Sequence, residues 1–277
     1  MKRYIHNRYE LRPIHENSIY CGVSVQGKRI NFDFDADSDK DIITLVNDSS
    51  GEYDDDNVMY VYGYTYTPNA RKTDVEIFRN FIKGKTTSRV WYNEDVEEFI
   101  KYGVLAIERY ADFSDFGAIV TLGKRNEVST VGMIRQQLMY YIQQGTIQFH
   151  LIKQAYENVQ FDRDLARIAM RKTKRYSDAQ IEDELDFTEH KFNQLKQNGG
   201  FFAIKKFLPP VLRAGFLNYF KFETEEERKV FEQLQGVNVL IYDDFMTSGS
   251  TIKEVIRYLR AINDRNTLTV FVLVKQH

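Results

Sequence analysis

The chain has 277 residues, 43% of them hydrophobic and 14% aromatic, which is enough apolar material for one large domain or two modest ones. A formal net charge of −2 excludes the overall positive charge of many nucleic-acid-binding proteins. The chain has a single cysteine, Cys21, which excludes an internal disulfide framework and a zinc site built from several cysteines. The N-terminal residues lack the apolar core of a secretory signal, and no stretch approaches the roughly 20 apolar residues of a transmembrane helix, so we expect a cytoplasmic protein.

Residues 1–112 have the pattern of a small α+β unit and carry no chemical motif that we recognise. Polar and apolar residues alternate in places over 19–35, and Gln26-Gly27 suits the turn of a β-hairpin. Residues 58–66 are rich in aromatic and β-branched residues, so we expect a strand that packs against this hairpin rather than one that lines a pocket. Apolar residues then recur at helical spacing over two segments, 74–84 and 95–110.

Residues 113–277 have the alternating strand and helix pattern of an α/β domain. Four apolar segments have the length and composition of buried strands: 116–122, 146–152, 238–242 and 268–274. A helix is expected between the first two, starting near Ser129, and strand–helix–strand units of this kind build parallel sheets. We therefore predict a doubly wound, mostly parallel sheet, whose ligands sit beyond the carboxyl ends of the strands.

The region between the second and third of these strands is rich in charge. Arg163, Arg167 and Arg171 recur at helical spacing and form a basic face that could hold phosphates or nucleic acid, although such a face is more often simply solvated. Gly199 and Gly200 end a second helix, and a third one, capped by Thr224, leads into the strand at 238–242.

The most informative stretch is VLIYDDFMTSGST, residues 239–251. An apolar strand runs into Asp243 and Asp244, and a cluster of Thr, Ser and Gly then opens an amphipathic helix. The first N–H groups of a helix lack partners and favour an anion, while the two acids could bind sugar hydroxyls or a hydrated Mg²⁺. A phosphorylated sugar fits both halves, whereas the alternative is an ordinary strand–turn–helix whose acids are solvated.

This stretch resembles the motif with which type I phosphoribosyltransferases bind 5-phosphoribosyl pyrophosphate (PRPP). The resemblance implies the type I phosphoribosyltransferase fold. It further implies that Asp243 and Asp244 hold the ribose hydroxyls, and that they hold Mg²⁺ indirectly, through PRPP and water. It also implies that the loop wraps the 5′-phosphate of PRPP, with these residues: Thr247, Ser248, Gly249, Ser250 and Thr251.

A second loop lies at the same predicted edge of the sheet, after the strand at 116–122. It offers Gly123 for close backbone approach and two cations, Lys124 and Arg125. By resemblance to the family, Leu122, Gly123, Lys124 and Arg125 would bind pyrophosphate. The alternative is a solvent-exposed basic turn, and the sequence leaves the two readings open.

The acceptor must be recognised by another part of the chain, which differs between members of this family. Only a few residues follow the last predicted strand, so we expect the N-terminal unit or the insertion at 161–205 to recognise it, and we favour the N-terminal unit. Family members often carry a mobile loop over the reacting centre, a role for which this chain offers a glycine hinge and three cations: Gly199, Gly200, Lys205, Lys206 and Arg213.

The expected function is transfer of the phosphoribosyl group of PRPP to an unidentified nucleobase-like acceptor in nucleotide salvage, with release of pyrophosphate. Two alternatives remain: a non-catalytic PRPP-binding or nucleotide-binding regulator, and a nucleic-acid-associated orphan member of the competence type. His150, His190 and His277 are isolated in the sequence and suggest no catalytic triad. Because dimers are common in the family, we expect a homodimer and no membrane partner.

Overall fold

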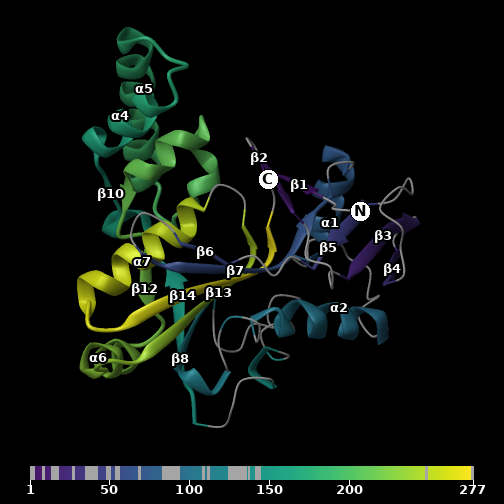
Figure 1. Ribbon diagram of the computed structural model, residues 1–277. Coiled ribbons are helices and arrows are strands. Elements are labelled where there is room, and N and C mark those ends of the chain that lie inside the picture. The colour runs from purple at the N-terminus through teal and green to yellow at the C-terminus, as the bar shows by residue number, and fades with distance from the viewer. Residues whose placement is uncertain are drawn as a thin grey trace. The chain divides into compact units, whose positions relative to one another are not determined.

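The structure is a computed structural model, shown in Figure 1. It describes residues 4–7, 10–13, 19–26, 29–34, 43–47, 51–53, 57–67, 70–82, 94–107, 110, 113–123, 136, 138–140, 145–246 and 249–275.

The chain forms two compact units, each built from more than one segment. Unit 1 comprises residues 1–149, 235–247 and 265–277, and unit 2 comprises residues 150–234 and 248–264. The expected N-terminal α+β unit, residues 1–112, lies wholly within unit 1, where its strands share a sheet with strands from the end of the chain.

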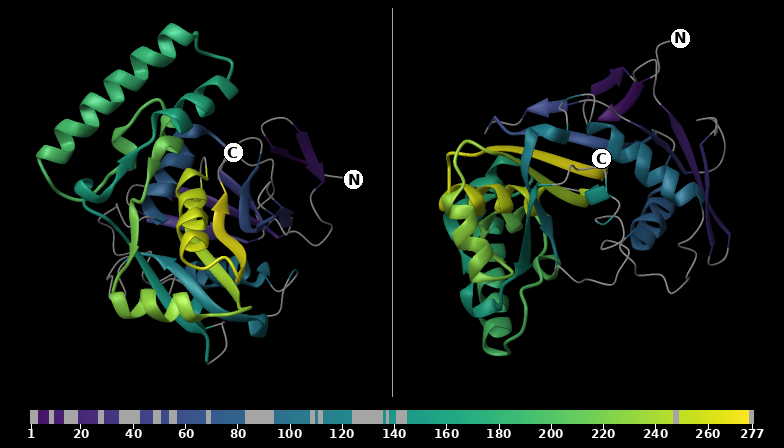
Figure 2. Two further views of the ribbon diagram at one scale, coloured as in Figure 1. Left: turned by 90° about the vertical axis from the view of Figure 1, so that its left-hand side faces the viewer. Right: turned by 90° about the horizontal axis from the view of Figure 1, so that it is seen from below.

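The fold is α/β, with a large mixed sheet at the centre of unit 1 whose middle strands are parallel (Figures 1 and 2). The strand order is β8-β13-β14-β7-β5-β3-β4, and β6 pairs with β7 outside this path. The strands are β3 (Tyr20–Gln26), β4 (Arg29–Asp33), β5 (Ile43–Val46), β6 (Gly51–Tyr53), β7 (Met59–Tyr66), β8 (Phe116–Leu122), β13 (Asn238–Met246) and β14 (Thr267–Lys275). A separate antiparallel pair joins β1 (Tyr4–Asn7) and β2 (Glu10–Pro13).

The pairing of the strands separates a parallel centre from an antiparallel flank. Parallel pairs are β8 with β13, β13 with β14, and β14 with β7. Beyond β7 the sheet continues through antiparallel pairs with β5, β3 and β4, and the predicted hairpin is confirmed because Gln26 lies opposite Arg29. Residues 58–66 form the expected strand, but β7 does not pair with the hairpin: β5 lies between them, and β7 pairs with β14 along most of its length.

Two helices of unit 1 lie wholly within the described residues, α1 (Lys72–Ile82) and α2 (Glu94–Leu105), close to the predicted segments, and both lie near the β3–β4 hairpin (Figure 2). A short 3₁₀ turn, η2 (Phe113–Asp115), precedes β8. The helix expected from Ser129 lies mostly outside the described residues, although positions 136 and 138–140 are helical.

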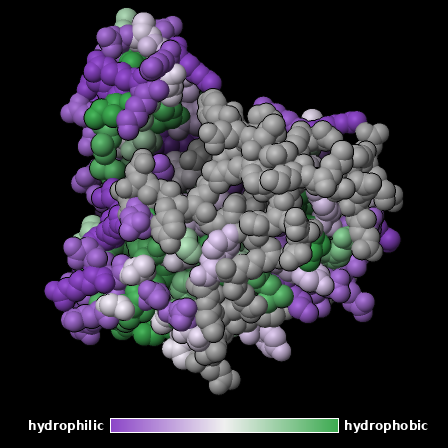
Figure 3. Space-filling view, viewed as in Figure 1, coloured by the Kyte–Doolittle hydropathy of each residue, from purple (hydrophilic) through white to green (hydrophobic). Residues whose placement is uncertain are grey.

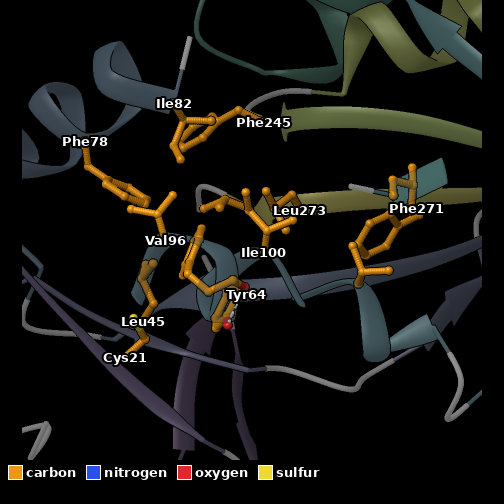
Figure 4. Packing of buried hydrophobic residues seen from close by; sticks show 14 of the residues in the cluster. Cys21, Leu45, Tyr64, Phe78, Ile82, Val96, Ile100, Phe245, Phe271 and Leu273 are labelled. Atoms are coloured by element: carbon orange, nitrogen blue, oxygen red, sulfur yellow. Dashed lines mark hydrogen bonds between the residues drawn. The ribbon is translucent and has the colours of Figure 1, made fainter. Parts of the chain in front are cut away.

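An aromatic stack forms the centre of the core of unit 1. The ring of Phe99 on α2 lies between Tyr64 of β7, at 4.4 Å between centroids, and Phe32 of β4, at 5.0 Å. Phe78 of α1 meets Phe99 edge-on at 5.8 Å, and the Tyr64 hydroxyl donates a hydrogen bond to the carbonyl oxygen of Phe99. Figure 4 shows Tyr64 and Phe78 in this core with Phe245 and Leu273. The core therefore joins the N-terminal elements to β13 and β14.

Two glycines let α2 approach the sheet closely. A Cβ atom at Gly63 on β7 would lie 2.9 Å from the carbonyl oxygen of Gly103 on α2, and one at Gly103 would lie 2.5 Å from the Cδ1 atom of Leu273 on β14. The buried Asn47 side chain donates to the carbonyl oxygens of Gly63, at 2.8 Å, and Tyr102, at 3.1 Å. A side chain at Gly63 would meet backbone atoms, so this position requires glycine, whereas one at Gly103 would force the Leu273 and Tyr64 side chains to shift.

We predict that Phe99→Ala lowers the free energy of unfolding by about 3–5 kcal/mol, because it removes a fully buried ring from the middle of the stack. Urea denaturation checks this, with Ile77→Ala on the same unit as control, since Ile77 is 40% exposed. Equal effects of the two substitutions would contradict the assignment of Phe99 to the centre of the core.

Unit 2 contains four helices and several short strands and turns among its described residues. Strand β9 (Ile147–Lys153) begins in unit 1 and pairs in unit 2 with β12 (Phe220–Phe222), and β10 (Gln160–Phe161) pairs with β11 (Phe216–Leu217). The helices are α4 (Arg163–Lys172), α5 (Asp178–Gln197), α6 (Glu225–Gln233) and α7 (Ser250–Ile262). The 3₁₀ turns are η3 (Tyr156–Asn158), η4 (Ile204–Lys206) and η5 (Pro210–Gly215).

The basic face predicted on α4 is neutralised by carboxylates of α5. Arg163 contacts Glu182 and Glu189, and Arg167 binds Glu182 through its Nε atom at 2.6 Å. Arg171 pairs with Asp178. Figure 3 shows polar and apolar residues together on the surface of this helix pair. The arginines remain partly exposed, as expected of a solvated face, but their charges are paired, so they lend no support to nucleic-acid binding.

The segment proposed as a mobile loop packs into a second aromatic cluster. Phe202, Phe207 and Phe216 are buried, with the rings of Phe207 and Phe216 only 4.2 Å apart. The Nζ atom of Lys206 lies 5.8 Å from the centre of the Tyr156 ring. Gly199 and Gly200 do end α5, with positive φ angles of 70° and 95°. The contacts fix this segment in place within unit 2.

We predict a specific acid dependence for the α4–α5 ion pairs. Hydrogen bonds from Arg167 and then Arg163 hold the pKa of Glu182 at about 2, below its ordinary value of 4.5. A lowered pKa means that Glu182 contributes its stability above about pH 4.5 and loses it as the pH falls toward 2. The difference in melting temperature between the native chain and Glu182→Gln should persist at about pH 4 and vanish near pH 2.

High salt should shrink this difference because the groups are near the surface. Glu184→Gln on the same helix is the control. A difference already lost by about pH 4 would show that Glu182 is not paired in solution.

Among the described residues, no helix is both long and apolar enough to cross a membrane.

Candidate functional site

The two acids of the motif lie within β13 rather than after it. The strand was expected to end at Tyr242, but it continues to Met246, because Phe245 pairs with Val274 and Met246 with Lys275 on β14. Successive residues of a strand point to opposite faces, so the side chains of Asp243 and Asp244 leave β13 on opposite sides. Asp243 is half-buried, whereas Asp244 is only 7% exposed.

Asp244 has an unusual environment for a carboxylate. Its Oδ2 atom is buried and has no hydrogen-bond partner among the residues that the structure describes. Burying a polar atom without a partner costs roughly 1–3 kcal/mol, and more for a charged group. A buried acceptor of this kind calls for a donor or a cation from a ligand or from the residues outside the described ranges.

The end of β8 lies beside the end of β13. Their parallel pairing extends as far as Thr121 opposite Tyr242, so Leu122 and Asp243 follow at the same edge of the sheet. On the other side of β8, the Thr121 hydroxyl donates to the carbonyl oxygen of Phe149 at the start of β9. The chain thus leaves β8 toward β9, while β13 lies on the opposite side and leads to β14. This is a topological switch point, where open α/β sheets bind their ligands.

The structure describes only part of the expected pyrophosphate loop. Leu122 is the last residue of β8, and Gly123 follows with a φ angle of 123°, which residues with a Cβ atom rarely adopt. Lys124 and Arg125 lie outside the described residues, so the role expected for them stays a prediction.

The expected phosphate loop is likewise described in part. Thr247 and Ser248 lie outside the described residues. Gly249 precedes α7 in the left-handed conformation, with a φ angle of 71°, and Ser250 and Thr251 form the first turn. The other long helices of unit 2 begin with a side-chain cap from Asp162, Ser177 or Thr224. Within the described part of the chain, no side chain caps α7, and its first N–H groups suit an anion.

A group of polar side chains missed in the sequence holds the start of α7. The Tyr219 hydroxyl donates to the carbonyl oxygen of Ser250 at 3.3 Å. Glu254, one turn later, is 5% exposed and accepts hydrogen bonds from the backbone N–H of Asn218, at 2.6 Å, and from the Nε atom of Arg257, at 2.7 Å. Burial is the main reason that the pKa of Tyr219 is raised, which keeps this hydroxyl a donor. We call Asn218, Tyr219, Glu254 and Arg257 the α7 clamp.

Sequence reasoning also missed the partners of His150. Its Nδ1 atom lies 2.9 Å from Glu227 Oε1, and Glu223 is nearby. No local pattern pointed to this group, since His150 and Glu227 are 77 residues apart. For the α7 clamp, the spacing of Glu254 and Arg257 on one predicted helix was an available signal.

No protein-family model and no curated protein matches the chain. The resemblance to phosphoribosyltransferases therefore rests on the residues of the motif.

We predict that Glu254→Gln destabilises unit 2 by about 1.5–3 kcal/mol, because it weakens hydrogen bonds to a buried charged group. The measurement is thermal or urea unfolding, with the exposed Glu232→Gln as a control that removes the same charge. If both variants unfold like the native chain, Glu254 does not hold the start of α7.

Proposed function

We propose that this chain is a phosphoribosyltransferase of the type I fold, which transfers the phosphoribosyl group of PRPP to a nitrogenous base in the cytoplasm. The mostly parallel sheet, the switch point between β8 and β13, and the order of strand, two acids, glycine and helix all support this proposal. The observation that carries it is the buried Oδ2 atom of Asp244, which lacks a partner among the described residues.

This observation argues for a ligand because stability alone does not explain it. A buried carboxylate oxygen without a hydrogen-bond partner lowers stability unless something binds it. Residues that cost stability in the free protein are expected where a ligand supplies the missing partner. Ribose hydroxyls are donors that would satisfy this oxygen.

Each motif residue has a role in the proposed reaction. Asp244 would accept hydrogen bonds from the ribose, and Asp243 would add negative charge near C1 of the sugar. The turn from Thr247 to Thr251 would bind the 5′-phosphate through backbone N–H groups and hydroxyls. Leu122, Gly123, Lys124 and Arg125 would bind the leaving pyrophosphate. The α7 clamp would fix the first turn of α7 for this purpose.

The donor set also fits Mg²⁺, since this ion prefers oxygen ligands and usually keeps several waters. Asp243 and Asp244 would hold it indirectly, through PRPP and water. When bound, Mg²⁺ supplies positive charge that offsets the charge on the pyrophosphate.

The proposed chemistry balances without a further reactant. The bond between ribose C1 and the pyrophosphate oxygen breaks, and its electron pair leaves with pyrophosphate. A new bond forms between C1 and a nitrogen of the acceptor, which loses a proton. Positive charge develops at C1 in between, and the side chains act mainly by positioning and by electrostatic stabilisation.

The acceptor side of the site is proposed to involve β7, in agreement with our preference for the N-terminal segment. Because β7, β14 and β13 are parallel, the end of β7 points to the same edge of the sheet as Asp244. Thr65 and Tyr66 at this end have buried hydroxyl oxygens without partners in the described part of the chain, and as successive residues they point to opposite faces of β7. One of these two hydroxyls would bind the polar edge of a base.

One observation favours the second candidate, a PRPP-binding regulator without catalysis. Asp243 and Asp244 point to opposite faces while β13 is extended, so a single ribose on one face meets only one of them. A site in which only one acid contacts the ribose would bind PRPP but would stabilise the positive charge that develops at C1 only weakly. Measuring binding and turnover separately distinguishes the two functions.

We predict that Asp244→Asn weakens PRPP binding by about 10- to 100-fold, because a hydrogen bond to a charged acceptor contributes about 1.5–3 kcal/mol. The same variant should melt at an equal or higher temperature than the native chain, since a buried carboxylate without a described partner is removed. Calorimetric titration of PRPP with Mg²⁺ and a thermal melt are the two measurements.

The exposed Asp264→Asn is the matched control and should bind PRPP like the native chain. Unchanged PRPP affinity in Asp244→Asn would overturn the assignment. A screen of nucleobases for pyrophosphate release then separates the functions: release with one base supports the enzyme, and binding without release from any base supports the regulator.

A further inference from the structure

Three side chains that can bind a metal ion meet inside unit 2. They are His150 on β9, Glu223 directly after β12, and Glu227 in the first turn of α6. A nitrogen of His150 and one carboxylate oxygen from each glutamate all lie within 4.8 Å of one another. His150 is 2% exposed and Glu227 is 7% exposed, while Glu223 is half-buried.

The fold fixes all three positions through the backbone. Strand β12 pairs with β9, with Phe222 opposite Leu151, and the N–H of Glu223 donates to the carbonyl oxygen of His150 at 2.8 Å. Thr224 then caps α6 by accepting a hydrogen bond from the N–H of Glu227. The three residues are therefore held by a strand pair and a capped helix rather than by a flexible surface loop.

Glu227 departs from the usual role of its position. In a capping box, the glutamate three residues after the cap binds back to the N–H of the capping residue, as Gln180 does on α5. The carboxylate of Glu227 instead accepts from the backbone N–H of His150, at 3.0 Å, and lies 2.9 Å from its Nδ1 atom. The Glu227 carboxylate therefore does not cap α6 but points inward and contacts His150.

The pairing of His150 with Glu227 does not explain Glu223. One carboxylate suffices to satisfy the N–H and the Nδ1 atom of His150. A second carboxylate at this distance adds like-charge repulsion in a poorly solvated place. A divalent cation removes this penalty. Ligand atoms about 2.1 Å from a metal lie roughly 3–3.5 Å apart, and the three ligand atoms here, all within 4.8 Å of one another, need only a small approach to reach that spacing.

We propose that His150, Glu223 and Glu227 form a binding site for a divalent transition-metal ion. One imidazole nitrogen and two carboxylate oxygens suit Zn²⁺ or Mn²⁺, whereas Mg²⁺ and Ca²⁺ prefer oxygen ligands alone. Three protein ligands leave at least one position for water, and the half-buried Glu223 lies on the more accessible side of the group. The ion would link β9, β12 and α6.

This proposal does not depend on the proposed function, because the group and the acids of β13 belong to different units. The metal also differs in kind from the Mg²⁺ proposed to accompany PRPP. A variant that loses only the transition metal should therefore keep its affinity for PRPP.

The test uses the full chain, stripped with a chelator and titrated with Zn²⁺ or Mn²⁺ in a calorimeter. We expect one equivalent to bind and to raise the melting temperature. Glu223→Gln should weaken binding at least tenfold, since even residues outside the ligand shell contribute about 10- to 100-fold to metal affinity. It keeps both contacts between His150 and Glu227, so it should still fold. Visible absorption of the Co²⁺ form should report nitrogen ligation.

The control is Glu226→Gln, an exposed position in the same turn that removes the same charge, and it should bind the metal like the native chain. Absence of saturable binding of both Zn²⁺ and Mn²⁺ would overturn the proposal. So would equal affinity in Glu223→Gln and Glu226→Gln, because binding would then be adventitious, and His150 and Glu227 would be a hydrogen-bonded pair only.

Discussion

Parallel pairing of β7 with β14 is the constraint on which the organisation of unit 1 depends. This pairing joins β7, which lies in the first quarter of the chain, to β14, which lies near residue 270. The central sheet can therefore form only when both segments are present. The stack of Tyr64, Phe99 and Phe32, together with the close approach at Gly63 and Gly103, then fixes α2 on this junction. The same pairing directs the end of β7 to the sheet edge that carries Asp244, and this relation makes an acceptor site in the N-terminal segment physically reasonable.

Buried polar contacts, together with the aromatic cluster, connect the helices and strands of unit 2. Glu254 joins α7 to the turn before β12, and Glu227 joins α6 to β9. Each is a carboxylate with at least two donors, the condition under which a buried charge is tolerated. Asp244 of unit 1 differs from both, because one of its oxygens has no partner in the described part of the chain. The contrast between satisfied and unsatisfied carboxylates separates residues that maintain the fold from one that suits a ligand.

Periodicity in the sequence predicted most helices and strands, including β8, β14, α1 and the Thr224 cap of α6, because these depend on local spacing. It failed at the end of β13, since Asp243 and Asp244 interrupt an apolar run, while pairing with β14 continues to Met246. Helical spacing placed the arginines of α4 on one face, but their partners on α5 are set by packing between helices. The partners of His150 could not be predicted from local spacing either, because tertiary packing brings Glu227 to it from 77 residues away. The fully buried pattern of β7 was a signal for a central strand that the sequence reading did not use.

Calorimetric titration of PRPP into the native chain with Mg²⁺ decides whether β13 and the turn before α7 bind a phosphorylated sugar. We expect saturable binding of one PRPP per chain, with ribose 5-phosphate competing because it carries the same sugar and 5′-phosphate. Absence of any binding of either compound would show that this part of the chain is not a sugar-phosphate site. The strand, acids and helix would then serve the fold alone.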